Sequence, residues 1–199
     1  SLATGVTSID EVSAAVARGA LLGARGNSGV LLSQILRGLP QAVRGRQRAR
    51  AAEIAQSLSI GVLHAYSAVA SPTEGTILTV AREVAAAAMK ESESATELRP
   101  FLEQIAAVAR TSVEKTPTLL AVLREAGVVD SGGTGLQFIL EGIADVPSVA
   151  ASRGAVEAER GGAGTPSDTP RPSAPLPVSE VPASTEFGYE TVFILSSPE

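Results

Sequence analysis

The chain has 199 residues, of which 44% are hydrophobic, 19% are charged and only 3% are aromatic, so it can bury a core, and that core is expected to be aliphatic. The formal net charge of −5 argues against a nucleic-acid-binding surface, and the lack of cysteine excludes disulfides and thiolate metal sites. The apolar runs are too short for a transmembrane helix, and the first residues do not form a signal peptide.

The first part of the chain predicts a series of amphipathic helices. Ser8 and Glu11 have the spacing of a capping box, and apolar residues then recur at helical spacing until Gly23 ends the run. The same periodicity predicts helices over residues 30–37 and 51–70, with a basic connection between them.

Start signals of the same kind recur further along the chain. Residues 71–74, Ser-Pro-Thr-Glu, combine a capping serine, a proline at the first helical position and a glutamate. The buried stripe of the helix that follows would comprise Ile77, Val80, Ala81, Val84 and Ala88. Further helices are expected over residues 94–115, 116–127 and 132–145, the last of them capped by Asp130. No segment up to this point requires a strand, and the short connections favour antiparallel neighbours, so the fold class is all-α.

The composition changes near the end of this helical region. Residues 150–185 are rich in Pro, Gly, Ser and Ala without periodicity, which predicts a linker that lacks stable structure. Residues 186–199 begin with an aromatic and β-branched run that predicts a strand. Because a single strand is not stable alone, we interpret it as the start of a truncated following domain. The helical domain would therefore occupy residues 1–149.

Two glycine-rich stretches point to a binding function. Residues 23–29, GARGNSG, lie between two helical patterns, and residues 130–135, DSGGTG, open a later helix. Free N–H groups and the helix dipole at such starts favour an anion such as phosphate. For either stretch alone, a tight turn between helices is an equally good interpretation. Arg25 could neutralise a bound anion or pair with a carboxylate.

The other polar residues form no recognisable catalytic or metal-binding pattern. His64 is the single histidine and has no acid or serine close to it in sequence, which favours a structural or surface role. No Ser/His/Asp arrangement or zinc-ligand spacing is visible. We therefore assign no catalytic and no metal residue within the chain.

Three stretches together resemble the nucleotide-binding, DhaL-like domain of the dihydroxyacetone kinase superfamily, with the greatest similarity to the amino-terminal domain of bacterial fatty acid kinase. They are residues 23–34, 74–83 and 123–136, and they occur in the family's order. The resemblance covers residues 8–145, and residues 187–189 resemble the start of the middle domain of these kinases. It implies a barrel of amphipathic antiparallel helices that binds ATP at one end.

The resemblance also implies which residues contact the nucleotide. These are Gly26, Asn27, Ser28, Gly29, Thr76, Thr79, Asp130, Gly132 and Gly133. The first four would hold the phosphates, the two threonines would line the barrel near the site, and the last three would lie by the adenosine. From the residues alone, Thr79 is instead expected to be satisfied on its own helix and Asp130 to act first as a helix cap.

This chain lacks the aspartate motif, of the Asp-Gly-Asp-Thr-Gly type, that holds magnesium in the family. Phosphoryl transfer depends on that metal for positioning and charge neutralisation. Asp10 and Glu11 are the earliest carboxylates and fit first-turn capping better. We therefore expect an internal piece of a longer kinase that uses ATP and Mg²⁺, with the magnesium ligands upstream and the chain alone inactive. Without the family's first segment, the barrel should be open on one side and expose aliphatic surface.

Two functions of different classes remain open. The first is a bacterial kinase of phospholipid metabolism that transfers the γ-phosphoryl group of ATP to a fatty acid on a carrier protein, or to a small hydroxy compound such as dihydroxyacetone. The second is a non-catalytic helical module that binds a lipid or a protein in its apolar interior. We expect a cytoplasmic protein without nucleic-acid partners, for which a homodimer is one assembly to test.

Overall fold

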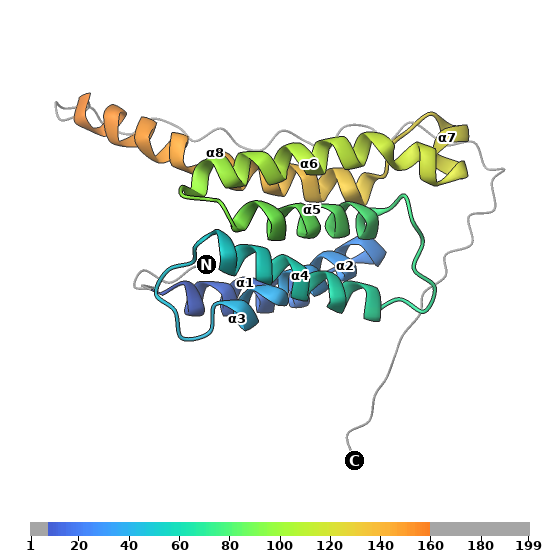
Figure 1. The fold of residues 1–199 in the computed structure, drawn as a ribbon, viewed down its shortest axis with the longest axis horizontal. Coiled ribbons are helices and arrows are strands. Elements are labelled where there is room, and N and C mark those ends of the chain that lie inside the picture. Colours follow the sequence, from blue (N-terminus) through green and yellow to red (C-terminus); the bar gives the residue numbers. More distant parts are fainter. Residues whose placement is uncertain (1–7, 160–199) are drawn as a thin grey trace, which may run out of the picture. The chain divides into compact units, whose positions relative to one another are not determined.

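The computed structural model describes residues 8–159, with side chains through residue 146, and every regular element in that range is an α-helix (Figure 1). In chain order the helices are α1 (Ile9–Gly23), α2 (Gly26–Leu36), α3 (Gly38–Ala42), α4 (Ala51–Ser67), α5 (Ile77–Ser92), α6 (Leu98–Leu119), α7 (Ala121–Ala126) and α8 (Ser131–Glu159). The expected all-α fold class is therefore confirmed for the described residues. Within them, no helix combines the length and the apolar character needed to cross a membrane.

The helices pack in a series that places α5 at the centre. Helix α1 contacts α2, α2 contacts α4, α4 contacts α5, and α5 contacts α6. Helix α8 begins beside both α5 and α6 (Figure 1). A Cβ atom on Gly133, near the start of α8, would lie 2.8 Å from the side chain of Val80 in α5 and 3.5 Å from that of Val113 in α6. The consecutive helices α5 and α6 lie side by side and run antiparallel, as the short connection between them predicts.

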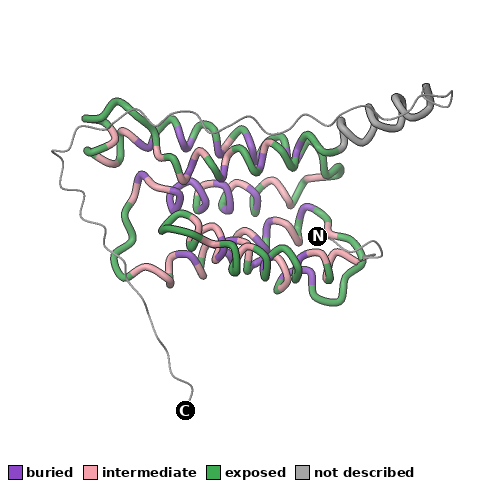
Figure 2. The backbone as a smooth tube through the Cα atoms, turned by 180° about the vertical axis from the view of Figure 1, so that it is seen from behind, coloured by how far each residue is buried: buried purple, intermediate pink, exposed green. Residues whose placement is uncertain are grey.

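Small aliphatic side chains form the core, and α5 contributes most of one face of it. Figure 2 shows buried segments on the inner sides of the helices and exposed residues on their outer sides. All members of the predicted α5 stripe are buried, namely Ile77, Val80, Ala81, Val84 and Ala88. Alanines such as Ala55, Ala65 and Ala109 are completely enclosed, which lets neighbouring helix backbones approach closely.

Helix α2 begins four residues earlier than expected. The predicted start was residue 30, with the glycine stretch as a loop, whereas the helix starts at Gly26. Only Ala24 and Arg25 separate α1 from α2. The glycines at positions 26 and 29 thus belong to the first turn of a helix, in which the N–H groups of Gly26, Asn27 and Ser28 have no partner within the helix.

Helix α6 continues through the point where a new helix was expected. Thr116 and Pro117 lie in the last turn of α6, and not at the start of the next helix. A proline in a helix leaves the carbonyl four residues earlier without its donor. The hydroxyl of Thr116 replaces that donor, because it donates to the carbonyl oxygen of Val113 at 2.7 Å.

The remaining differences concern short or terminal segments. Helix α3 was not expected, and it contains Pro40 as its third residue. Helix α8 runs to Glu159, beyond the expected end at residue 145. The rest of the predicted linker and the predicted strand over residues 186–199 lie outside the described residues. The described helices form one compact unit as far as Arg153, while the domain boundaries themselves stay predictions.

Candidate functional site

The two glycine-rich stretches meet in the folded chain. A Cβ atom on Gly132, in the first turn of α8, would lie 2.9 Å from Ser28 Oγ, in the first turn of α2. The same Cβ atom would lie 3.3 Å from the Cβ of Ile77, the first residue of α5. The N-terminal ends of α2, α5 and α8 therefore converge at one place.

The convergence favours a bound anion. Each helix N-terminus carries unpaired N–H groups and about half a positive charge from the helix dipole. At α2 the capping position is Arg25, whose side chain makes no cap hydrogen bond, so the N–H groups of this turn remain available. Asn27 and Ser28 in the same turn are exposed. Three such ends together are suited to the charge of a polyphosphate.

Asp130 fixes the start of α8. Its Oδ2 accepts a hydrogen bond from the N–H of Gly133 at 2.6 Å, the expected helix cap. Its own N–H donates to Thr116 Oγ1 at 3.0 Å, which ties the cap to the end of α6. The hydroxyl of Thr116 thus donates to the carbonyl oxygen of Val113 and at the same time accepts from the N–H of Asp130. The prediction that Asp130 acts first as a cap is consistent with this geometry.

The start of α5 differs from the prediction. The cap is Thr76, whose Oγ1 accepts from the N–H of Leu78 at 3.3 Å, and not Ser71. The Thr76 hydroxyl also donates to the carbonyl oxygen of Thr73 at 2.8 Å. The capping-box interpretation of residues 71–74 was wrong because Glu74 is bonded elsewhere, as described next.

Glu74 is the centre of a hydrogen-bonded cluster beside the start of α5. Its carboxylate accepts from Thr79 Oγ1 at 2.7 Å and from the Tyr66 hydroxyl at 3.2 Å. Arg82 donates to both carboxylate oxygens, with Nη1 at 2.9 Å and Nη2 at 2.8 Å. Thr79 is completely buried and also accepts from the N–H of Gly75 at 2.8 Å. Its hydroxyl is thus used within the protein.

The cluster holds Glu74 in its ionised form. Donation from the Thr79 hydroxyl, followed by the charge of Arg82 and the Tyr66 hydroxyl, lowers the pKa of Glu74 below its ordinary value. Partial burial opposes this effect and is outweighed by it. The same arrangement raises the pKa of Tyr66, first through burial and then through the nearby negative charge.

The two predicted glycines of the first stretch, Gly26 and Gly29, lie at the short turn between α1 and α2. A Cβ atom on Gly29 would face Ala24 at 3.6 Å, and both residues border a groove of about 440 Å³. Gly26 has a positive φ of 65°, which only glycine adopts without strain. Arg25 donates to the carbonyl oxygens of Ala24 and Leu22 and, among the described residues, is not paired with a carboxylate. Its neutralisation of a bound anion stays a prediction.

The described residues do not supply a magnesium site. No three of their His, Asp or Glu side chains lie close enough together to hold a metal ion. Of the nearest carboxylates, Asp130 caps α8 at the convergence, and Glu74, which precedes α5 in the chain, is paired with Arg82. His64 lies elsewhere, in α4, with its Nε2 2.8 Å from the side-chain nitrogen of Gln41. The helix ends therefore fit the phosphates of a nucleotide, whereas these residues do not fit its metal.

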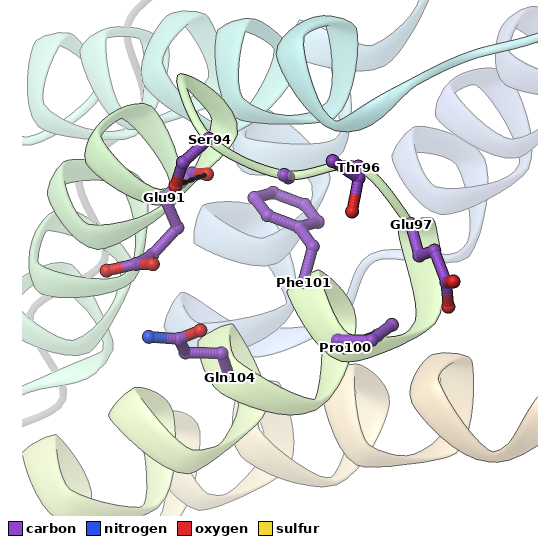
Figure 3. Close-up of a pocket in the computed structure, with 8 residues that line it drawn as sticks. Glu91, Ser94, Thr96, Glu97, Pro100, Phe101 and Gln104 are labelled. Atoms are coloured by element: carbon purple, nitrogen blue, oxygen red, sulfur yellow. Dashed lines mark hydrogen bonds between the residues drawn. The ribbon is translucent and has the colours of Figure 1, made fainter.

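A separate hollow lies at the other end of α5 (Figure 3). It has a volume of about 390 Å³ and is bordered by the end of α5 and the start of α6, with Phe101 at its centre and Glu91 and Gln104 beside it. None of the predicted site residues lines it. Its polar groups belong to open surface, so we place the candidate site at the helix N-termini instead.

Sequence reasoning missed several residues that shape the site. Tyr66, Arg82 and Thr116 were not among the predicted site residues, and Glu74 was interpreted only as a cap. A first usable signal in the sequence was Tyr66, which is one of only two tyrosines in the chain. A hydroxyl of Thr116 next to Pro117 was a second signal, because a proline leaves an acceptor in need of a donor.

Comparison with known proteins places the chain in a family. A family model described as the DAK2 domain matches residues 3–145. The chain is 46% identical over 134 residues to protein YloV of Bacillus subtilis (strain 168), an alignment that covers 67% of this chain and 24% of that protein. It is 47% identical over 135 residues to an uncharacterized protein of Staphylococcus haemolyticus (strain JCSC1435), covering 68% of this chain and 24% of the relative. The chain thus spans about a quarter of the length of these curated relatives.

Proposed function

Because the chain belongs to the DAK2-domain family of DhaL-like kinases, we propose that it is the nucleotide-binding part of an ATP-dependent phosphotransferase. One observation carries this proposal, namely the convergence of the N-termini of α2, α5 and α8 around Ser28, Ile77 and Gly132. Positioned N–H groups and helix dipoles are what a kinase needs to hold the phosphates of ATP.

In this proposal each helix end has a distinct role. The N–H groups of Asn27 and Ser28 donate to the phosphates, and the Ser28 hydroxyl adds a donor that can rotate. Gly132 leaves open the space that a side chain would fill. The turn that contains Gly133 and is capped by Asp130 faces the nucleoside part. The nucleotide is thus oriented by backbone groups on three rigid helices, and its Mg²⁺ would be held by groups other than the described residues.

Paired glycine variants test the phosphate site. Gly132→Ala would place a methyl group between Ser28 and α8, whereas a Cβ on Gly135, one turn along α8, has no heavy atom within 4 Å. We expect calorimetric titration of the intact protein with ATP and MgCl₂ to show binding about tenfold weaker for Gly132→Ala and unchanged for Gly135→Ala. Equal affinity of Gly132→Ala and the wild type, or no binding by the wild type, would overturn the proposal.

The phosphoryl acceptor is proposed from the family. We propose transfer to a fatty acid held by a carrier protein, with a small hydroxy compound such as dihydroxyacetone as the competing acceptor, in the bacterial cytoplasm. The aligned segment covers only 24% of YloV and of the Staphylococcus haemolyticus relative, which is compatible with a nucleotide-binding part of a longer protein. Formation of ADP from Mg-ATP in the presence of a fatty-acid-loaded carrier, compared with dihydroxyacetone, distinguishes the two acceptors.

A second function has a specific observation in its favour. The outer face of α8 exposes a row of large apolar side chains at helical spacing, namely Phe138, Ile139, Ile143 and Val146. A helix that is apolar on its outer as well as its inner side is usually covered. A helical module that binds a lipid or a protein would explain this face without any nucleotide. It becomes the better account if the intact protein binds no ATP.

A further inference from the structure

The loop between α4 and α5 is held by hydrogen bonds to both of these helices. Residues 68–76 connect the two helices, and Glu74 within the loop receives donors from both of them. Tyr66 belongs to α4, while Thr79 and Arg82 belong to α5. The loop is therefore tied to the helix before it and to the helix after it through one carboxylate.

The residue after Glu74 is tied down as well. Gly75 has a φ of 81°, and a Cβ atom there would lie 2.8 Å from the Cβ of Leu120 and 3.0 Å from the carbonyl oxygen of Thr116. Its N–H donates to Thr79 Oγ1, which in turn donates to Glu74. The Thr79 hydroxyl thus relays between the loop backbone and the carboxylate. The loop thus packs against the end of α6, and it cannot move without breaking the hydrogen bonds that join Gly75, Thr79 and Glu74.

What this arrangement fixes is the start of α5. Thr76 follows Gly75 directly and caps α5, and Ile77 is the residue of α5 that meets Gly132 and lies near Ser28. Glu74 and Arg82 form an ion pair in which 44% of the Glu74 side chain and 49% of the Arg82 side chain are exposed. Exposed ion pairs contribute little to folding stability. A bidentate pair does impose direction, so its effect here is on placement more than on stability.

We propose that Glu74 is a positioning residue of the nucleotide site: with Thr79 and Arg82 it sets where the N-terminus of α5 stands against α2 and α8. The inference rests on the proposed nucleotide binding and adds to it a residue that does not touch the ligand. Loss of the carboxylate lets the loop and Thr76 move away from the phosphates. Affinity for ATP then falls while the fold persists.

A matched pair of glutamates tests this. Glu74→Gln replaces an acceptor of Arg82, Thr79 and Tyr66 by an amide whose NH₂ group faces donors. Glu141→Gln is the control, because Glu141 also accepts from one arginine, Arg110 at 2.6 and 3.1 Å, on the surface of α8. We expect ATP binding by the intact protein to weaken about tenfold for Glu74→Gln and not for Glu141→Gln, at similar urea midpoints.

The relay gives a second, independent readout. Thr79→Val keeps the shape and removes the hydroxyl, whereas Thr79→Ser keeps the hydroxyl, so serine should recover most of the affinity that valine loses. If Glu74→Gln does not fold, Arg82→Gln removes the same bidentate pair from an exposed position. If the wild type binds ATP and both Glu74→Gln and Glu141→Gln bind it with the same affinity, this inference is overturned and the proposed function stands. Absence of binding by the wild type would overturn both.

Discussion

Gly38 and Gly61 lie so close together that neither position has room for a Cβ atom. A Cβ on Gly38 would lie 2.6 Å from the backbone nitrogen of Gly61, and a Cβ on Gly61 would lie 2.9 Å from the Cα of Ile35. The nearest atoms in both cases are backbone carbonyl oxygens, of Ser57 and Ile35 respectively. The end of α2 and the start of α3 therefore rest directly on the backbone of α4, where no side chain can rotate away.

Gly61→Ala is expected to destabilise the protein strongly. The new methyl group would have to push the α2 backbone away from α4, and overpacking of this kind costs about 1–3 kcal/mol or more. Urea denaturation measures the change in the free energy of unfolding. Gly19→Ala is the control, because Gly19 lies inside α1 and a methyl group added there would have no heavy atom within 4 Å. There the substitution should stabilise by roughly 0.5–1 kcal/mol, and similar effects at both positions would contradict the prediction.

Asp130→Ala should destabilise the protein by about 0.5–2 kcal/mol, because it removes the cap on the N–H of Gly133. Asp130→Asn keeps an acceptor oxygen at the cap and should retain most of the stability. Both changes remove a negative charge from beside the convergent helix ends. We therefore expect Asp130→Asn to bind ATP at least as tightly as the wild type, which calorimetry can check. Weaker binding by Asp130→Asn would show that the carboxylate itself contacts the ligand.

The pH dependence of stability should report on Glu74. Its pKa in the folded state is lower than its ordinary value of 4.5, chiefly because Thr79 donates to it. A lowered pKa contributes stability above the unfolded-state value, and this contribution is lost as the pH falls through the folded-state value. The difference in unfolding free energy between the wild type and Glu74→Gln should therefore be largest near neutral pH and narrow below about pH 4.5. Parallel pH profiles from urea titrations would contradict this. Because the side chain is partly exposed, the effect should be small and should shrink in high salt.

Phe138→Ser and Leu140→Ala should separate the two faces of α8. Phe138 is 62% exposed and Leu140 only 7% exposed. We expect the first change to alter the unfolding free energy by less than about 0.5 kcal/mol and the second to cost about 2–5 kcal/mol. Binding of the dye ANS should fall in Phe138→Ser if the outer face is open in solution. Sedimentation at increasing concentration would show whether this face joins two copies, and an unchanged association in Phe138→Ser would exclude that role.

The sequence was sufficient to predict the helices whose apolar stripe and cap lie close together in the chain. The buried face of α5 and the cap at Asp130 were both predicted correctly, because each depends on residues within a few turns. The start of α2 at Gly26 was not predicted correctly, because the glycines at positions 26 and 29 are intrinsically poor helix formers. Packing of α2 against α1 and against the turn between them, where Gly29 faces Ala24, overrides the local preference.

The site could be predicted only in part, for a similar reason. The glycine stretches predicted two of the helix ends that converge, those of α2 and α8. The sequence around Ile77 does not indicate that the start of α5 lies beside them. Glu74 has the spacing of a capping residue, and its actual partners include Tyr66 on the preceding helix. Roles set by contacts between helices are not visible in periodicity. The nucleotide-binding residues themselves stay predictions that the experiments above can test.

The convergence of α2, α5 and α8 also has a consequence for biosynthesis. Ser28, Ile77 and Gly132 belong to the early, middle and late parts of the helical region, so the site does not exist until α8 has left the ribosome and docked. A ligand that binds only this assembled state stabilises it by mass action. Cellular nucleotide would then act on the newly made chain as a folding ligand, and it would favour those molecules in which all three helices have already come together.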